Sequence, residues 1–122
     1  LGKADLTEAL KNPDAKVGDA VPVPENPESL PEVQLSTLMQ EKAAFEGQWI
    51  QVSGKCIKVN PAIMGRNWVH IQASDGTKLV LTTQEEVAPG QELRFAARVA
   101  LDRDFGSGYS YPLLLEQGQL VE

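Results

Sequence analysis

The apolar residues of this chain change their spacing once, at Trp49. Beyond that residue, apolar and polar residues alternate, which is the pattern of β-strands with one buried and one exposed face. Turn-forming residues divide this region into runs that predict five strands, at residues 49–59, 68–72, 78–83, 93–101 and 109–116. Gly54 interrupts the first run and indicates a bulge or sharp bend in a long strand.

Residues 37–46, just before the first strand, have the pattern of one short helix. Thr37 with Gln40 three residues later fits a capping box, and Gly47 supplies a stop signal. Three apolar residues fall on one side of this helix and are expected to face the strands: Leu38, Met39 and Phe45.

The five strands, the bent first strand and long loops after strands one and four predict a small barrel. This combination is typical of an all-β, five-stranded oligonucleotide/oligosaccharide-binding (OB) fold. The helix that such barrels usually carry between strands three and four has no room here, because residues 84–91 are few and contain Pro89. We therefore expect one short helix before the first strand instead.

Residues 1–34 differ from the rest in composition. Four prolines fall within residues 21–32, and proline forces extended chain on itself and its predecessor. We expect a domain of residues 35–122 preceded by an extended, proline-rich tail of residues 1–34. The tail holds seven acids and three bases, and the domain ten acids and eight bases, so the domain is nearly neutral.

The charge and the cysteine content exclude several classes of protein. A net charge of −6 argues against tight, non-specific binding of nucleic acid, which needs clustered Lys and Arg. Cys56 is the only cysteine, so an internal disulfide and a cysteine metal cluster are excluded; we expect a buried thiol, with an intermolecular disulfide as the alternative. No apolar run is long enough to span a membrane. The chain begins at Leu1, which fits a removed export leader or a trimmed start.

The second strand carries the candidate ligand residues. If Val69 and Ile71 point into the barrel, Trp68 and His70 lie on its outer face, where OB folds usually bind ligands. Trp68 can then stack on a base or sugar, and Arg66 can meet a phosphate, with two tyrosines completing the platform: Tyr109 and Tyr111. The alternative is that Trp68 is a packing residue that covers the barrel against the helix or the tail.

His70 is the only histidine and has no partner for a metal site or a catalytic triad. A hydrogen-bonded surface histidine is the alternative to a ligand residue. The sequence has no P-loop, paired catalytic carboxylates or nucleotide-binding glycine motif, so no enzyme activity is expected.

The segment Asp102–Gly108 is the second candidate loop. Asp102 and Asp104, followed by glycines, resemble the start of a calcium loop, which makes Ca²⁺ the one cofactor to consider. The alternative is a glycine-bent hairpin whose aspartates bind the backbone. Phe105 and Tyr109 are expected to pack against Trp68 or Met64.

Several runs together resemble a family of small exported bacterial OB-fold proteins. They are Val59-Asn60-Pro61, Ile63-Met64-Gly65-Arg66-Asn67-Trp68, His70-Ile71-Gln72, Asp75-Gly76, Leu81-Thr82-Thr83, Ala100-Leu101-Asp102-Arg103-Asp104-Phe105-Gly106, Gly108-Tyr109 and Tyr111. Members are described as OB-fold or DNA-binding-like proteins, or as accessory proteins of nitrite-reductase clusters. The resemblance covers about residues 36–116 and implies an exported (periplasmic or extracellular), non-enzymatic OB fold. Cys56 departs from it, because an aliphatic residue is expected there.

Two functional hypotheses follow. In the first, the chain is a structural or assembly module whose tail, through Val21, Val23 and Leu30, adds to the sheet edge of a neighbouring copy. Such a head-to-tail homo-oligomer extends into a filament unless it closes into a ring. In the second, the chain binds single-stranded nucleic acid or a glycan through Arg66, Trp68, Tyr109 and Tyr111. The acidity of the chain places the second hypothesis behind the first.

Overall fold

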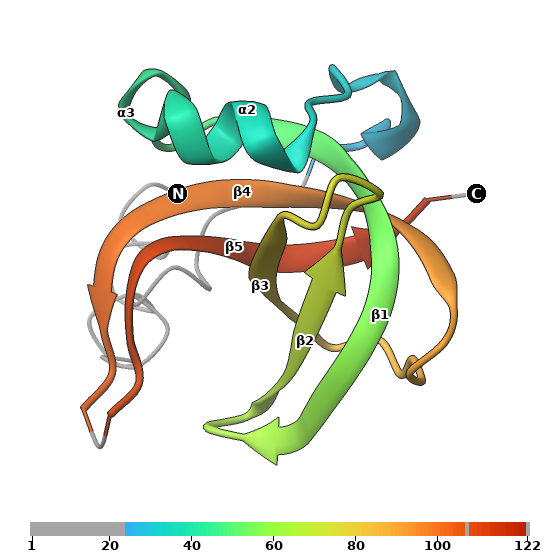
Figure 1. Cartoon of the computed structure of the whole chain (residues 1–122), viewed down its shortest axis with the longest axis vertical. Helices are drawn as coiled ribbons and strands as arrows, with labels where there is room; N and C mark the ends of the chain where they lie inside the picture. The colour runs from blue at the N-terminus through green and yellow to red at the C-terminus, as the bar shows by residue number, and fades with distance from the viewer. Residues whose placement is uncertain (1–23, 107, 122) are drawn as a thin grey trace, which may run out of the picture.

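The computed structural model describes residues 24–106 and 108–121. Five strands form one sheet that closes in a ring, in the order β1-β2-β3-β5-β4 (Figure 1). Neighbouring strands are antiparallel except β3 and β5, which are parallel. The strands are β1 (Trp49–Ile63), β2 (Arg66–Gln72), β3 (Lys78–Thr83), β4 (Glu92–Asp104) and β5 (Ser110–Leu120). The predicted all-β class is therefore confirmed, with two short helices.

The ring closes because β1 changes partner along its length. Its first half, Trp49 to Lys55, pairs with β4, and its second half pairs with β2 from Lys55 onward. Gly54, where a bulge or sharp bend was predicted, lies at this exchange, and a Cβ there would stand 3.1 Å from the carbonyl oxygen of Gln72. The register irregularity itself falls just beyond, between Cys56 and Lys58.

The connection between β1 and β2 is shorter than predicted. β1 continues through Pro61 to Ile63, and β2 begins at Arg66 rather than at Trp68. Pro61 is tolerated because the register shifts between Asn60 and Ile63, so the missing N–H breaks no regular ladder. The expected long loop is a two-residue turn, Met64 and Gly65, in which both residues have positive φ, 54° and 77°.

The β4–β5 pair is also longer than predicted, at two different ends. β4 continues past Leu101 to Asp104, toward the hairpin tip, and β5 continues past Glu116 to Leu120, where it pairs with the start of β4. The sequence pattern missed both extensions because Asp102 and Gln117, which have positive φ, interrupt the alternation where each extension begins. The predicted absence of a helix between β3 and β4 is confirmed for residues 84–91.

The predicted helix of residues 37–46 is two short helices, α2 (Leu35–Gln40) and α3 (Lys42–Phe45), and a 3-10 turn η1 (Pro27–Ser29) precedes them. The capping box was wrong, because the N-cap is Gln34 and its side chain makes no capping bond. Burial determines the start instead: Leu35 and Leu38 are 1% and 0% exposed. Met39, expected on the same side, is 49% exposed.

One apolar core fills the ring and is covered at one end by α2 (Figure 1). Leu35 and Leu38 enter it beside the inward residues of the strands. Cys56 belongs to this core and is fully buried, and burial raises the pKa of its thiol. The buried-thiol prediction is confirmed, and a fully buried sulfur cannot reach a second chain without unfolding.

Residues 28–33, called the strap below, lie against the first half of β1. The Val33 N–H donates to the Gln51 carbonyl at 2.9 Å, and the Gln51 N–H donates to the Pro31 carbonyl at 2.8 Å. The Gln51 side-chain amide donates to the carbonyls of Glu28 and Leu30, at 2.9 and 2.7 Å. The proposed assembly residue Leu30 is thus held by its own barrel. Val21 and Val23 lie outside the described residues.

Candidate functional site

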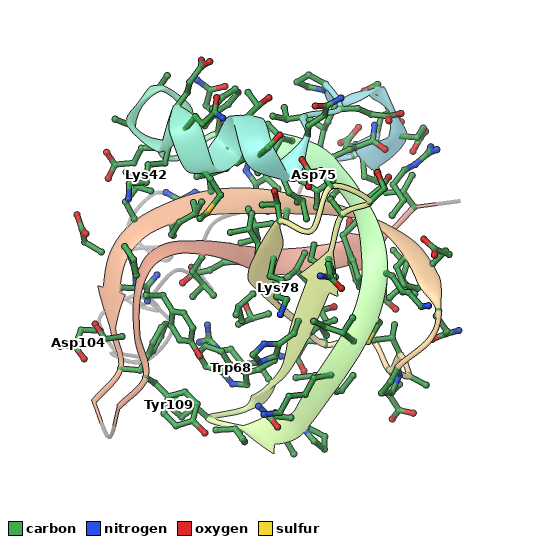
Figure 2. All side chains as sticks on the ribbon, in the orientation of Figure 1. Lys42, Trp68, Asp75, Lys78, Asp104 and Tyr109 are labelled. Carbon is green, nitrogen blue, oxygen red and sulfur yellow. The ribbon has the colours of Figure 1, made fainter. Side chains whose placement is uncertain are left out.

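Figure 2 shows Trp68 and Tyr109 at the end of the barrel away from α2, and Phe105 and Tyr111 pack against the same indole ring. The ring of Trp68 lies 5.3 Å from Phe105, 5.4 Å from Tyr109 and 5.5 Å from Tyr111, measured between centroids. Tyr111 is stacked on it at 26°, and Phe105 meets it edge-on at 89°. We call these four residues the aromatic cluster. The predicted packing of Phe105 and Tyr109 on Trp68 is confirmed, whereas Met64 is 45% exposed.

Trp68 belongs to the outer face of β2, as predicted, because Val69 and Ile71 belong to the core. It is nevertheless 0% exposed, since the β4–β5 hairpin folds over it. Its indole N–H donates to the Ile63 carbonyl at 2.8 Å. Trp68 is therefore a packing residue, covered by this hairpin rather than by the helix. The outer rings of the cluster, Phe105, Tyr109 and Tyr111, are only half-buried.

Two arginines flank the ring of Phe105. The guanidinium carbon of Arg103 lies 4.8 Å from the ring centroid, and that of Arg66 lies 5.4 Å away. Arg103 also forms an ion pair of 2.5 Å with Glu116, whose side chain is fully buried. The Arg66–Phe105 contact joins β2 to the β4–β5 hairpin, and the Arg103–Glu116 ion pair joins β4 to β5.

A polar groove of about 370 Å³ continues from Arg66 across the outer face of β3 and β5. We call it the β3–β5 groove. Its lining side chains end in amides, hydroxyls, one carboxylate and one guanidinium, while their aliphatic parts make up about half of the surface: Arg66, Thr82, Thr83, Gln84, Glu85, Gln117, Gly118 and Gln119. Hydrogen-bonding groups of both kinds, beside aromatic rings, suit a ligand with polar edges and flat faces.

The sequence did not identify the glutamines of this groove. Gln117 has φ of 55°, and the β3–β5 register shifts between Leu81 and Thr83, so strand alternation breaks where the groove forms. The cluster of glutamines in Gln117-Gly118-Gln119 is the one signal that the sequence offered.

His70 lies two residues from Trp68 on β2, opposite Lys58 of β1. It is half-buried, and burial, followed by the charge of Lys58, lowers the pKa of His70 below its usual 6.5. The ring is therefore neutral at physiological pH and can donate or accept one hydrogen bond. It does not line the β3–β5 groove.

The pKa of Tyr111, in the aromatic cluster, is shifted in the opposite direction to that of His70. Burial, and then neighbouring Tyr109, raises the pKa of the Tyr111 phenol further above neutral pH, where its hydroxyl is a hydrogen-bond donor. Tyr109 and Tyr111 pack on Trp68, and Arg66 lies over Phe105 in the same cluster; their use as a ligand platform stays a prediction.

The aspartates of the second candidate loop are exposed at the outer part of the hairpin. The Asp104 carboxylate accepts the N–H of Gly106 at 2.9 Å, which is the backbone role offered as the alternative to calcium. Asp102 has φ of 53°. Within residues 24–106 and 108–121, no three His, Cys, Asp or Glu side chains are grouped to hold a metal ion. A calcium site at Asp102 and Asp104 stays a prediction.

No helix in the described part of the chain is long and apolar enough to cross a bilayer. No protein-family model matches the sequence. No curated protein matches it either. The chain is similar to solved structures, as follows.

Among the solved structures with a similar fold are proteins whose names refer to nucleic acid. A protein from Klebsiella pneumoniae, provisionally described as a nucleic acid-binding lipoprotein, is similar with a TM-score of 0.58 and 14% identity, over 84% of this chain and 100% of that one. A provisionally described aspartyl-tRNA synthetase from Leishmania major is similar with a TM-score of 0.56 and 9% identity. Asparaginyl-tRNA synthetase from Entamoeba histolytica gives 0.54 and 9%.

The aligned region takes in 77% and 76% of this chain in the two comparisons. It spans only about a fifth of the synthetases, 21% of the first and 23% of the second. At these identities the likeness shows the fold alone, and the fold is the OB arrangement that the strand order also gives.

Proposed function

We propose that this chain is a non-catalytic OB-fold binding module that holds single-stranded nucleic acid on the outer face of β2, β3 and β5. The observation that carries the proposal is the continuity of three features: the aromatic cluster, the guanidinium of Arg66 beside it, and the β3–β5 groove that begins at Arg66. Strands two and three form the usual ligand face of OB folds.

Each feature has a role in such binding. The half-buried rings of Tyr109 and Tyr111 offer flat faces on which bases stack, and Trp68 supports them from beneath. Phe105 carries the guanidinium groups of Arg103 and Arg66 over its ring and packs edge-on against Trp68. Arg66, which is 9% exposed and lines the start of the groove, supplies positive charge for a phosphate that enters there. The side-chain amides of the groove pair with exposed base edges, as in other single-strand readers.

The charge of the chain sets the expected strength. The domain of residues 35–122 has ten acids and eight bases, so binding depends on stacking and hydrogen bonds more than on counterion release. We therefore expect modest affinity with a shallow dependence on salt. The name of the Klebsiella protein, a nucleic acid-binding lipoprotein, supports nucleic acid as the ligand proposed here. The word lipoprotein in that name also supports the proposal that this chain is exported. Membership in the exported OB family that the sequence resembles is part of the same proposal.

The test is fluorescence polarisation with a labelled oligothymidylate of about fifteen nucleotides, at salt of about 50 and about 200 mM. We expect binding at the lower salt that Arg66→Gln and Tyr109→Ala each weaken by about tenfold or more. Arg94→Gln is the matched control, because Arg94 lies by the strap and pairs weakly with Glu32 at 3.8 Å. No binding at the lower salt, or equal effects of Arg66→Gln and Arg94→Gln, contradicts the proposal.

Two further experiments test the other parts of the proposal. If a labelled neutral glucan oligomer binds in the same polarisation assay and the oligothymidylate does not, with loss in Tyr109→Ala, the ligand is a glycan. If the protein turns over a substrate and His70→Ala abolishes that turnover, the non-catalytic part of the proposal is wrong.

A second candidate is the assembly module, in which the tail links copies of the chain. Its support is that the first half of β1 accepts an extended segment in parallel, as the strap shows through Gln51. Here that segment belongs to the same chain, so residues before the strap would have to provide any link. Removal of residues 1–23 is then expected to reduce the assembly to monomers in analytical ultracentrifugation. Unchanged size after the removal rejects this candidate.

A further inference from the structure

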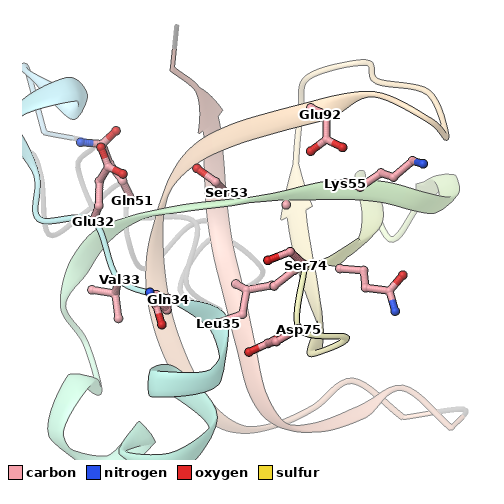
Figure 3. A pocket seen from close by; sticks show the side chains of 13 residues that line it. Glu32, Val33, Gln34, Leu35, Gln51, Ser53, Lys55, Ser74, Asp75 and Glu92 are labelled. Carbon is pink, nitrogen blue, oxygen red and sulfur yellow. The ribbon is translucent and has the colours of Figure 1, made fainter.

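A second, larger groove of about 750 Å³ lies on another part of the barrel, beside the strap (Figure 3). The strap and the start of α2 form one side of it, and the β2–β3 turn forms the other. The middle of β1 runs across it. We call it the β1-edge groove, and its lining is Glu32, Val33, Gln34, Leu35, Gln51, Ser53, Gly54, Lys55, Gln72, Ala73, Ser74, Asp75 and Glu92.

The backbone of β1 points its hydrogen-bonding groups into this groove. The N–H and C=O of Gln51 both bond to the strap, so they point away from β4. Those of Cys56 bond to the other side, to Gln91 and Gly90. Because strand groups alternate and the β1–β4 register is unbroken from Trp49 to Lys55, the groups of Ser53 point the same way as those of Gln51.

The strap does not continue along this edge. After Val33 the chain turns into α2, whose first residue Leu35 enters the core. Within residues 24–106, no backbone hydrogen bond joins Ser53 to the strap or to the β2–β3 turn. The edge that the strap uses at Gln51 therefore continues, toward Ser53, into an open groove.

The rest of the lining suits a peptide. Four exposed or half-buried side chains carry amide or hydroxyl groups: Gln34, Ser53, Gln72 and Ser74. Val33 and Ala73, both half-buried, add apolar surface for one side chain of a ligand. Three acids against one base leave the groove negative, and Asp75 stays ionised because hydrogen bonds, chiefly from the Thr77 backbone, lower its pKa.

We propose that the β1-edge groove is a docking site for an extended, basic peptide segment of a partner protein, which adds to β1 at Ser53 alongside the strap. Backbone hydrogen bonds to Ser53 provide part of the affinity, as in other cases of strand addition. Asp75 and Glu92 select basic side chains. This surface is separate from the β3–β5 groove, so the two sites can be occupied together.

The experiment uses the full chain, labelled with ¹⁵N, and two hexapeptides, one of alternating valine and lysine and one of alternating valine and glutamate. We expect the basic peptide to bind and to shift the amide signals of Ser53, Gly54 and Ser74. The acidic peptide is expected to bind about tenfold more weakly or not at all. No binding of the basic peptide at millimolar concentration, or shifts confined to β3 and β5, overturns the proposal.

Variants separate the two sources of affinity. Ser53→Pro removes the N–H that points into the groove, on the side away from β4, and is expected to weaken the basic peptide about tenfold, whereas Ser53→Ala keeps it. Asp75→Asn with Glu92→Gln is expected to remove the preference for the basic peptide, whereas Glu86→Gln, an exposed acid elsewhere, is not. If the first pair bind alike, strand addition is wrong, and if the second pair bind alike, charge selection is wrong. The acid variants test the site even if Ser53→Pro does not fold.

Discussion

Trp68 was predicted either to stack on a ligand or to pack against the protein, and it is a packing residue. Its place on the outer face of β2 followed from alternation, because Val69 and Ile71 are core residues. Its complete burial did not follow, because the rings that cover it come from a hairpin more than thirty residues away in the chain. A large outward aromatic residue is thus the base of the site rather than its contact surface.

Replacing Trp68 by alanine is expected to destabilise the protein by about 3–5 kcal/mol, because a buried indole leaves a large cavity and three ring contacts are lost. Urea unfolding followed by far-ultraviolet circular dichroism measures the change. Met64→Ala, at the exposed turn nearby, is the control and is expected within about 0.5 kcal/mol of the parent. Equal effects of the two substitutions contradict the assigned burial of Trp68.

His70 is expected to make stability depend on pH. Its pKa is lowered in the folded state, so as pH falls below about 6.5 the unfolded chain binds a proton first. Stability is then lost between that pH and the lower folded pKa, and is fully present above it. Urea unfolding of His70→Gln at pH 7.5 and at pH 5.5 is expected to show a smaller fall than the parent. An identical fall in both proteins rules out a contribution from His70.

At the scale of elements, the sequence predicted that the strap is not part of the core, but it did not predict where the strap packs. Prolines at positions 27 and 31 predicted a segment that cannot form a core. The place where it docks depends on Gln51, a strand residue with both side-chain and backbone bonds to it and only 2% exposure. A glutamine inside an alternating pattern is otherwise unremarkable.

Gln51→Ala is expected to loosen the strap, because two side-chain hydrogen bonds are lost together with the packing of a buried residue. Hydrogen exchange of the amides of residues 28–33 is expected to become several-fold faster, with about 1–2 kcal/mol lost in global stability. Gln48→Ala is the matched control, since Gln48 donates a similar bond to Ala44 in an exposed place. Unchanged exchange in Gln51→Ala means that other contacts hold the strap.

At the scale of the whole molecule, one core joins every strand to α2. The closed ring leaves the ends of the barrel as its open faces, and α2 fills one of them with Leu35 and Leu38. A helix of six residues has little stability alone, so its place depends on this burial.

A substitution in α2 is therefore expected to unfold the barrel and the helix together. Leu38→Ala is expected to cost about 2–5 kcal/mol, with coincident unfolding curves from near- and far-ultraviolet circular dichroism. Met39→Ala, the exposed neighbour, is expected to change little. If the helix signal in Leu38→Ala is lost first, at lower urea than the barrel signal, the single-core description is wrong.

The sequence by itself determined the strand number, the inward faces of β2, the buried Cys56 and an irregularity in β1 near Gly54. These features depend on local rules: alternation, glycine and proline geometry, and the apolar character of a residue. The extended tail predicted for residues 1–34 was wrong at Pro27–Ser29, which form a 3-10 turn, and its residues 1–23 lie outside the described part. Only the tertiary structure decided the remainder, namely the strand ends, the start of α2 at Leu35, the covering of Trp68 and both grooves. They depend on contacts between residues far apart in the chain, whose energies no local pattern contains.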